Sequence, residues 1–241
     1  RLSRRAVSVD ANPLSGLIGR VKTGFLNPTV RSDLDQLRAA VEGYIASRAP
    51  TKAGWQKSII NQYKTYIPDI PNIEKWFAES VVAELALIRF LISEITDGLA
   101  SDAAQIALSR IILRVSYQDS ETRYVAGPKS IHPGLALSAF VESLNTILRR
   151  LEYSASSLQR VDARFIVADS RTEIAEQIGS SSVELIVTSP PYPNATDYHL
   201  YHRFRLFWLG FDPRKLGHVE IGSHLKHQRN DTGIEEYNED M

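Results

Sequence analysis

The segment best suited to chemistry is Ser-Pro-Pro-Tyr at residues 189–192, which follows the apolar run VELIVT. Proline fixes its φ angle at about −65° and has no N–H group, so the backbone of Pro190 and Pro191 is stiff. A stiff loop can hold the Ser189 hydroxyl and a proline carbonyl where both accept hydrogen bonds from an –NH₂ group. The amine of a nucleobase is a weak nucleophile, because its lone pair is delocalised into the ring. Two fixed acceptors would favour a pyramidal nitrogen and expose that lone pair to an electrophilic methyl group.

Tyr192 adds a flat face next to these acceptors. A base that has left a duplex can stack on such a ring, a contact that contributes about 1–3 kcal/mol. The alternative interpretation of Pro-Pro-Tyr is a turn or a ligand for a proline-binding module. Because the segment ends an apolar strand, we favour the chemical role.

Two acidic residues follow the other predicted strands. Asp10 ends the strand AVSV, and Asp169 ends the strand ARFIVA. In an open parallel sheet, ligands bind beyond the carboxyl ends of the strands. One acid there can accept hydrogen bonds from both hydroxyls of a ribose, and the next can accept one from the amine of an adenine. The alternative is that each acid only forms a turn or caps a helix.

The elements that must position these residues alternate in type. A strand over residues 6–9 and a helix that starts near Asn12 and Pro13 come first. Helical periodicity then extends from residue 32 to about 155, with a long apolar helix predicted over residues 73–97. Ser32 with Asp35 resembles a capping box, and Ser101 is expected to cap a further helix. We therefore predict a first core part (1–31), a helical insertion (32–160) and a second core part (161–241).

The second core part is expected to begin with the strand that ends at Asp169 and a short helix, TEIAEQIG. A third strand follows over residues 183–189, and its near-continuous apolar character is typical of a parallel strand buried on both faces. Residues 198–209, YHLYHRFRLFWL, suit an aromatic amphipathic helix.

The sequence TSPPY after VELIV resembles the catalytic motif of the amino-methyltransferases, which move a methyl group from S-adenosylmethionine to an exocyclic nitrogen. The segments VSVDANPLSGLIGRVKT, VSYQDSETRY and SPPYPNATDYHLYHRFRLFWLG are similar to parts of site-specific DNA methylases within that group. The serine form of the motif is commonest among enzymes that methylate cytosine N4, and the aspartate form among those that methylate adenine N6. The resemblance implies an α/β fold with a Rossmann-like S-adenosylmethionine methyltransferase core, incomplete in this chain, and a large all-helical insertion.

The resemblance also assigns roles to residues. Catalysis falls to Ser189, Pro190, Pro191 and Tyr192; cofactor binding to Asp10, Asn12, Pro13, Asp169 and Ser170; and contact with the target base or DNA to Asn194, Asp197, Tyr198 and Arg203. The implied activity is methyl transfer to a DNA base, with cytosine N4 preferred over adenine N6, in a cytoplasmic restriction–modification setting. An RNA base is the alternative substrate.

One part of the family pattern is absent. The glycine-rich cofactor loop should precede the first strand, but the sequence opens with RLSRRAVSVD and contains no such loop downstream. We therefore expect an internal fragment of a longer protein, or one piece of a split enzyme whose loop comes from another chain. A catalytically inactive nucleic-acid-binding or assembly module is the alternative outside the enzyme class.

Composition limits other functions. The chain of 241 residues has no cysteine, which excludes disulfides and thiolate metal sites, and no apolar run reaches the roughly 18–20 residues that span a bilayer. The formal net charge is zero, but basic residues gather within residues 1–31 and 199–230, where they can attract phosphates or simply be solvated. Five of the six histidines follow residue 198, which raises the alternative of a metal hydrolase. We predict no metal, and we expect His199 and His202 to face solvent or DNA.

Overall fold

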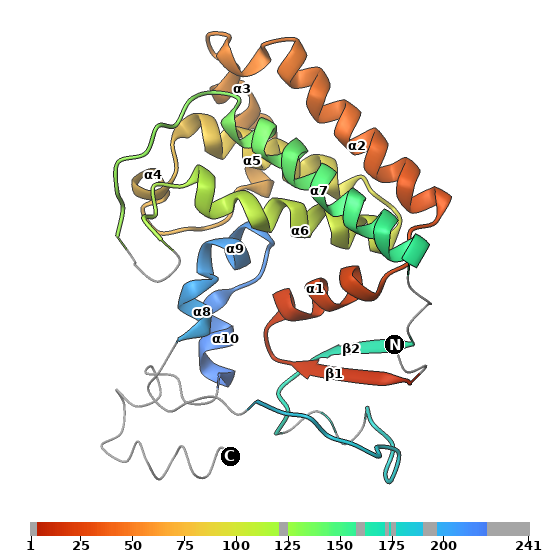
Figure 1. Cartoon of the computed structure of the whole chain (residues 1–241). Helices are drawn as coiled ribbons and strands as arrows, with labels where there is room; N and C mark the ends of the chain where they lie inside the picture. Colours follow the sequence, from red (N-terminus) through yellow and green to blue (C-terminus); the bar gives the residue numbers. More distant parts are fainter. Residues whose placement is uncertain are drawn as a thin grey trace, which may run out of the picture.

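The computed structural model describes residues 4–120, 125–157, 162–171, 174, 177–189 and 197–220. This part of the chain is mostly helical and contains a small parallel sheet of two strands (Figure 1). In chain order its elements are β1 (Ala6–Asp10), α1 (Pro13–Thr23), α2 (Pro28–Ala46), the 3₁₀ turn η1 (Ala49–Thr51), α3 (Trp55–Gln62), the 3₁₀ turn η2 (Lys64–Tyr66), α4 (Ile73–Trp76), α5 (Glu79–Ser93), α6 (Gly98–Val115), α7 (Leu135–Ser157), β2 (Ala163–Val167), α8 (Tyr198–Tyr201), α9 (Arg203–Trp208) and α10 (Pro213–Val219).

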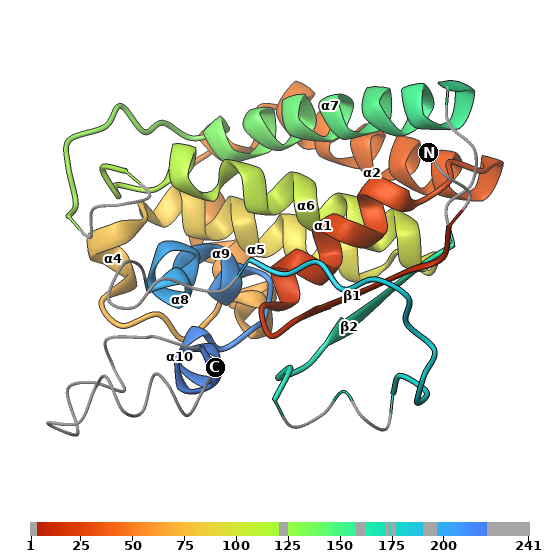
Figure 2. The same ribbon diagram turned by 60° about the horizontal axis from the view of Figure 1, so that its bottom comes forward.

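The two strands run side by side although about 150 residues separate them in the chain. Ala6 pairs with Ala163 at one end of the ladder, and Asp10 pairs with Val167 at the other. Both strands point their carboxyl ends toward the side of the molecule that holds α8, α9 and α10 (Figures 1 and 2). The parallel register therefore brings the ends of two distant segments to one edge.

Helix α1 packs between the sheet and the helical body. Asn12 caps its first turn by accepting a hydrogen bond from the Leu14 amide at 3.0 Å, and Pro13 occupies the first helical position, where no N–H is needed. Gly19 faces β2 so closely that an added Cβ would lie 2.1 Å from the Phe165 ring. On the other side, Arg20 Nη2 donates to Asp102 Oδ1 of α6 at 3.1 Å. The spacing between sheet and helices thus depends on a residue without a side chain.

The main core lies among α2, α5, α6 and α7. Helix α5 is buried almost all round, which explains why its sequence is apolar without a polar face. Its one buried charge, Glu84, lies at the N-terminus of α7. The Glu84 carboxylate accepts hydrogen bonds from the amides of Gly134 (2.6 Å), Ala136 (2.8 Å) and Leu137 (3.3 Å). Three backbone donors that would otherwise be unsatisfied are paired in this way.

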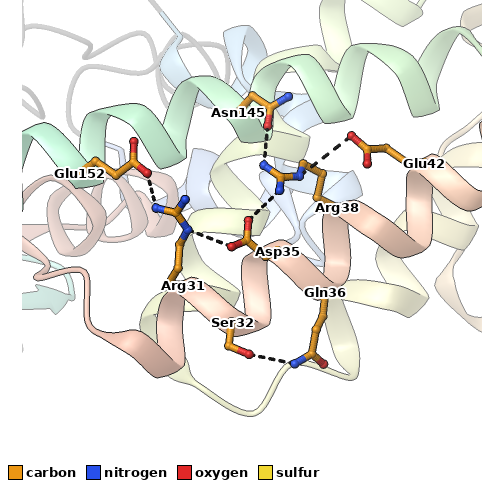
Figure 3. Close-up of polar contacts among 8 residues, drawn as sticks. All are labelled: Arg31, Ser32, Asp35, Gln36, Arg38, Glu42, Asn145 and Glu152. Carbon is orange, nitrogen blue, oxygen red and sulfur yellow. Dashed lines mark hydrogen bonds and ion pairs between the residues drawn. The ribbon is translucent and has the colours of Figure 1, made fainter.

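On the outer surface of this body, polar side chains join α2 to α7 (Figure 3). Arg31 pairs with Asp35 at 2.9 Å and with Glu152 of α7, and Arg38 pairs with Asp35 at 2.9 Å. Arg38 Nη1 also donates to Asn145 Oδ1 of α7 at 3.2 Å. Exposed ion pairs of this kind contribute about 0–1 kcal/mol each, so the buried apolar contacts remain the main source of stability.

Aromatic packing attaches α9 to the helical body. The Phe204 ring lies 5.0 Å from Trp76 and 5.5 Å from Phe77, and Trp208 lies 5.6 Å from Phe77, measured between ring centroids. All four side chains are almost completely buried. Aromatic pairs at these distances contribute about 0.5–1.5 kcal/mol beyond their burial. The segment that follows the Ser-Pro-Pro-Tyr loop is therefore anchored firmly at its far end.

The structure corrects the prediction of a third strand over residues 183–189. This run is extended but pairs with no strand in the described part of the chain, and its side chains are exposed: Leu185 is 69%, Ile186 80% and Val187 86% accessible. An apolar run is stable as a strand where a neighbouring strand pairs with its backbone and another element covers its apolar side chains. Neither is provided here by the described residues.

Several helix boundaries also differ from prediction. The long helix expected over residues 73–97 is interrupted at Phe77, where α4 ends and α5 follows. The helix expected over residues 198–209 divides at His202 into α8 and α9. Asn27 rather than Ser32 caps α2, and Asp97 rather than Ser101 caps α6, because each side chain accepts hydrogen bonds from the first free amides. In the predicted helix TEIAEQIG, the described residues Ile174, Gln177 and Ile178 form turns.

Among the described residues, none of the helices combines the length and the apolar character that crossing a membrane requires.

Candidate functional site

Asp10 lies at the carboxyl end of β1, as predicted, and is exposed. Its Oδ1 atom accepts a hydrogen bond from the Asn12 amide at 2.8 Å, which shapes the turn into α1. Its Oδ2 atom accepts no hydrogen bond from the described residues. Asp10 therefore forms a turn, as the alternative interpretation of this acid expected. Its second oxygen still offers a hydrogen-bond acceptor at the sheet edge. Asn12 and Pro13 have clear structural roles at the start of α1.

Asp169 follows β2 by two residues and lies at the same edge of the sheet as Asp10. Its carboxylate is paired with Arg171, whose Nη2 lies 2.8 Å from Oδ2 and whose Nε lies 3.0 Å from Oδ1. Arg171 Nη2 also donates to the Val219 carbonyl at 3.4 Å. Ser170, between them, is exposed. The structure thus joins the end of β2 to the end of α10 through a residue that the sequence pattern did not single out.

Ser189 is exposed and lies at the end of the extended run over residues 183–189. It is not built into the sheet that carries Asp10 and Asp169. The other three residues of the motif, Pro190, Pro191 and Tyr192, lie outside the described residues, as does Asn194. Their predicted roles stay predictions.

The described residues after the loop begin with Asp197, which precedes α8. The backbone carbonyl of Asp197 accepts hydrogen bonds from the Leu200 amide at 3.0 Å and the Tyr201 amide at 3.3 Å. Tyr198 is exposed, as a residue that contacts a base or DNA must be. The Arg203 guanidinium lies over the Phe204 ring, 5.3 Å from its centroid. This contact ties Arg203 to the aromatic cluster and is a packing role.

His199 is buried, contrary to the prediction that it faces solvent or DNA; only 2% of its surface is accessible. Its Nδ1 lies 2.6 Å from Glu220 Oε2, and the Glu220 side chain is itself almost buried. Glu220 also accepts hydrogen bonds from the amides of Tyr198 at 2.6 Å and His199 at 3.2 Å. Because Glu220 is 21 residues from His199, local patterns gave no sign of this pairing.

Helix α10 places Glu220. Asp212 caps the helix by accepting from the Arg214 amide at 2.9 Å, and Pro213 fits the first helical position. The Arg214 side chain also donates to Asp212, and this hydrogen bond lowers the pKa of the Asp212 carboxyl below its usual range. The short helix then ends at Val219, which leaves Glu220 next to α8.

Within the described residues, which exclude His224 and His227, no group of three His, Asp or Glu side chains is arranged to hold a metal ion. A polar groove of about 420 Å³ lies between α2 and α7, lined by Arg31, Arg38, Glu142, Asn145, Leu148, Arg149 and Glu152. Arg31 and Arg38 are occupied by acidic or amide partners, and Figure 1 shows α2 and α7 at the top of the molecule and the two strands toward the bottom.

Comparison with known proteins identifies a distant relative. The chain is similar to the Type II methyltransferase M.MjaII of Methanocaldococcus jannaschii, with 28% identity over 193 residues. The alignment covers 69% of this chain and 36% of that protein, so the chain spans about a third of its relative's length. No family model matches the sequence, and no solved structure matches it.

Proposed function

We propose that this chain is part of a DNA amino-methyltransferase that transfers a methyl group from S-adenosylmethionine to an exocyclic amine of a DNA base. The observation that carries the proposal is the similarity to a Type II methyltransferase, which covers 69% of this chain. The Ser-Pro-Pro-Tyr segment of the sequence is consistent with that similarity. Cytosine N4 is the preferred acceptor and adenine N6 the second, because the motif begins with serine. The parallel pair β1–β2, with α1 on its face, is consistent with part of a Rossmann-like core.

The residues at the sheet edge fit the cofactor that the proposal requires. Asp10 is exposed at the end of β1 and has an oxygen without a hydrogen bond from the described residues, as a carboxylate that accepts from a ribose diol needs. Asp169 lies at the end of the adjacent strand, on the side assigned to the adenine. Its carboxylate is held in place by the ion pair with Arg171.

When bound, S-adenosylmethionine supplies an electrophilic sulfonium methyl group. The chain's own residues position the acceptor. Ser189 Oγ and a proline carbonyl would accept hydrogen bonds from the base amine, which would keep the nitrogen lone pair available for the methyl carbon. Tyr192 stacks on the base, so that the amine is held in line.

The proposed core still needs a glycine-rich cofactor loop, which we assign to a segment outside the printed sequence or to another chain. Two features support this part of the proposal. Strand β1 pairs with β2 on one edge only, among the described residues, and the apolar run over residues 183–187 is exposed. One further strand between β1 and the run over residues 183–187 would pair with the open edge of β1 and cover part of that run.

The test is transfer of a radiolabelled methyl group to duplex DNA and to tRNA, with the full-length protein. Ser189→Ala should lower transfer to DNA by about 10²–10³-fold, as expected for removal of a preorganised hydrogen-bond group. Ser180→Ala is the matched control, because it changes an exposed serine that precedes the run over residues 183–189.

Tyr192→Ala should lower transfer by about 10–100-fold, corresponding to about 1–3 kcal/mol of lost stacking, whereas Tyr192→Phe should retain it. Tyr153→Ala, on the exposed surface of α7, is the control. Full transfer by both Ser189→Ala and Tyr192→Ala would reject the mechanism. Labelling of tRNA instead of DNA would support the RNA alternative, and failure of the full-length protein to bind S-adenosylmethionine in calorimetry would favour an inactive binding module.

A further inference from the structure

Three segments that are distant in the chain meet beyond the strand ends: the turn after β2, the start of α8 and the end of α10. Arg171 links the first to the third, because it pairs with Asp169 and donates to the Val219 carbonyl. Glu220, the next residue after Val219, links the third to the second. A continuous set of polar contacts therefore runs from the predicted cofactor acid Asp169 to Tyr198, the second described residue after the Ser-Pro-Pro-Tyr loop.

The Glu220 carboxylate uses both oxygens at the start of α8. Its Oε1 accepts from the Tyr198 amide at 2.6 Å, and its Oε2 accepts from the His199 amide at 3.2 Å and from His199 Nδ1 at 2.6 Å. The accessible fractions of the His199 and Glu220 side chains are 2% and 10%. Hydrogen bonds to a buried charge are stronger than those between neutral groups, and loss of one partner leaves the other unsatisfied.

From these contacts we infer that Glu220, held by His199, is a positioning residue that fixes the start of α8, the first described helix after the Ser-Pro-Pro-Tyr segment, relative to Asp169. The inference rests on the proposed function, because the loop is assumed to hold the target base. Glu220 does not touch the reacting atoms. It sets where Tyr198 begins α8.

The chain supports this role on both sides of the contact. Beyond α8, the Phe204 and Trp208 rings of α9 are fixed in the aromatic cluster with Trp76 and Phe77. Helix α8 has four residues and receives no side-chain hydrogen bond from its own cap residue, Asp197, so its first amides depend on Glu220. Without that carboxylate, the segment between the loop and the aromatic cluster would lose its attachment to the sheet side of the molecule.

The first test measures how firmly Glu220 holds the start of α8, and it does not depend on methyl transfer. Hydrogen exchange of the Tyr198 and His199 amides should accelerate at least about 10-fold in Glu220→Ala, since their acceptor is removed, while amides of α6 stay protected. Glu220→Gln, which keeps one acceptor oxygen, should give an intermediate rate. Glu184→Ala, at an exposed glutamate, is the control. Unchanged protection of Tyr198 and His199 in Glu220→Ala would overturn the inference whether or not the protein transfers methyl groups.

The second test separates positioning from folding. Glu220→Ala should lower kcat for methyl transfer by about 10²-fold, the loss that a displacement of about 1 Å can cause, with the Kd for S-adenosylmethionine within a factor of two. His199→Asn, which keeps a donor near the Nδ1 position, should recover most of the activity that His199→Phe loses. Equal loss in both histidine variants, or wild-type kcat in Glu220→Ala, would overturn the inference. If the wild-type protein transfers no methyl group to DNA, the proposed function fails, and the exchange rates still decide the structural link.

Discussion

Glu84 shows how strongly the hydrogen bonding and the pKa of a carboxylate depend on its surroundings. It is fully buried in α5, yet it is placed against three backbone amides at the start of α7. Burial raises the pKa of Glu84 above its usual value, and the hydrogen bonds from Gly134, Ala136 and Leu137, with the nearby His132, only partly offset this rise. Asp10, which is exposed, accepts a hydrogen bond from the Asn12 amide, and its other oxygen accepts none from the described part of the chain.

Glu84 should make stability depend on pH. Because its pKa is higher in the folded than in the unfolded protein, the folded state holds more protons in the interval between the two values. The free energy of unfolding from this group is therefore greatest below the unfolded pKa, about 4.3, and falls as the pH rises through the folded pKa. Urea unfolding at several pH values should show that the free energy of unfolding of the wild type, relative to that of Glu84→Gln, falls as the pH increases. A difference that is constant with pH would contradict the raised pKa.

The sequence allowed the strand ends to be predicted at the residue scale, because an acid after an apolar run is a local feature. Asp10 and Asp169 lie at one sheet edge, as predicted. The contacts of Arg171 and Glu220 were not predictable, since each joins segments that are brought together only by the folded chain. Local spacing identifies which residues can do chemistry, and long-range packing decides what holds them.

At the scale of elements, the docking of α1 on β2 depends on Gly19. An added methyl group at this position would lie only 2.1 Å from an atom of the Phe165 ring, so α1 or the ring would have to move. Glycine normally weakens a helix interior by about 1 kcal/mol relative to alanine. At Gly19, the close packing of α1 on β2 that glycine permits outweighs this loss of helix stability.

Gly19→Ala should therefore destabilise the protein, by about 1–3 kcal/mol, as overpacking does in other cores. Gly43→Ala is the matched control, because Gly43 lies within α2 and an added Cβ would contact nothing within 4 Å. The control should raise the free energy of unfolding by up to about 1 kcal/mol. Thermal unfolding of both variants gives the comparison, and a stabilised Gly19→Ala would refute the close packing of α1 on the sheet.

Helix starts show why element boundaries were predicted less well than element types. Asn27 and Ser32 both suit a cap near the start of α2, and Asp97 and Ser101 both suit one near the start of α6. In each pair the earlier residue caps the helix, because the helix extends back until apolar packing ends. Periodicity identifies the helical stretch, but the competition between nearby caps is decided by tertiary contacts.

At the scale of the whole molecule, the run over residues 183–187 is exceptional for its exposed apolar surface. It has the composition of a buried strand, and its burial was predicted for that reason. A strand is stable only beside another strand, and the described residues provide none for it. Exposed runs of this kind are typical of surfaces that another segment or chain covers.

Replacement of Ile186 and Val187 by serine should leave the free energy of unfolding of the 241-residue chain unchanged within about 0.5 kcal/mol, because both side chains are exposed. Self-association, measured by light scattering, should decrease. Ile166→Ser in β2 is the control: this side chain is buried, and its replacement should reduce stability by at least about 2 kcal/mol. If the double variant were destabilised as much as the control, the run would have to be packed against the protein.

The aromatic junction between α9 and the helical body carries its own optical reporter. Of the three tryptophans in the chain, Trp76 and Trp208 are both buried at this junction, and the third, Trp55, lies in α3. Intrinsic fluorescence is therefore weighted toward the point where the segment after the Ser-Pro-Pro-Tyr loop joins the rest of the molecule. A ligand that pulled α9 away would shift the emission to longer wavelength without any added label.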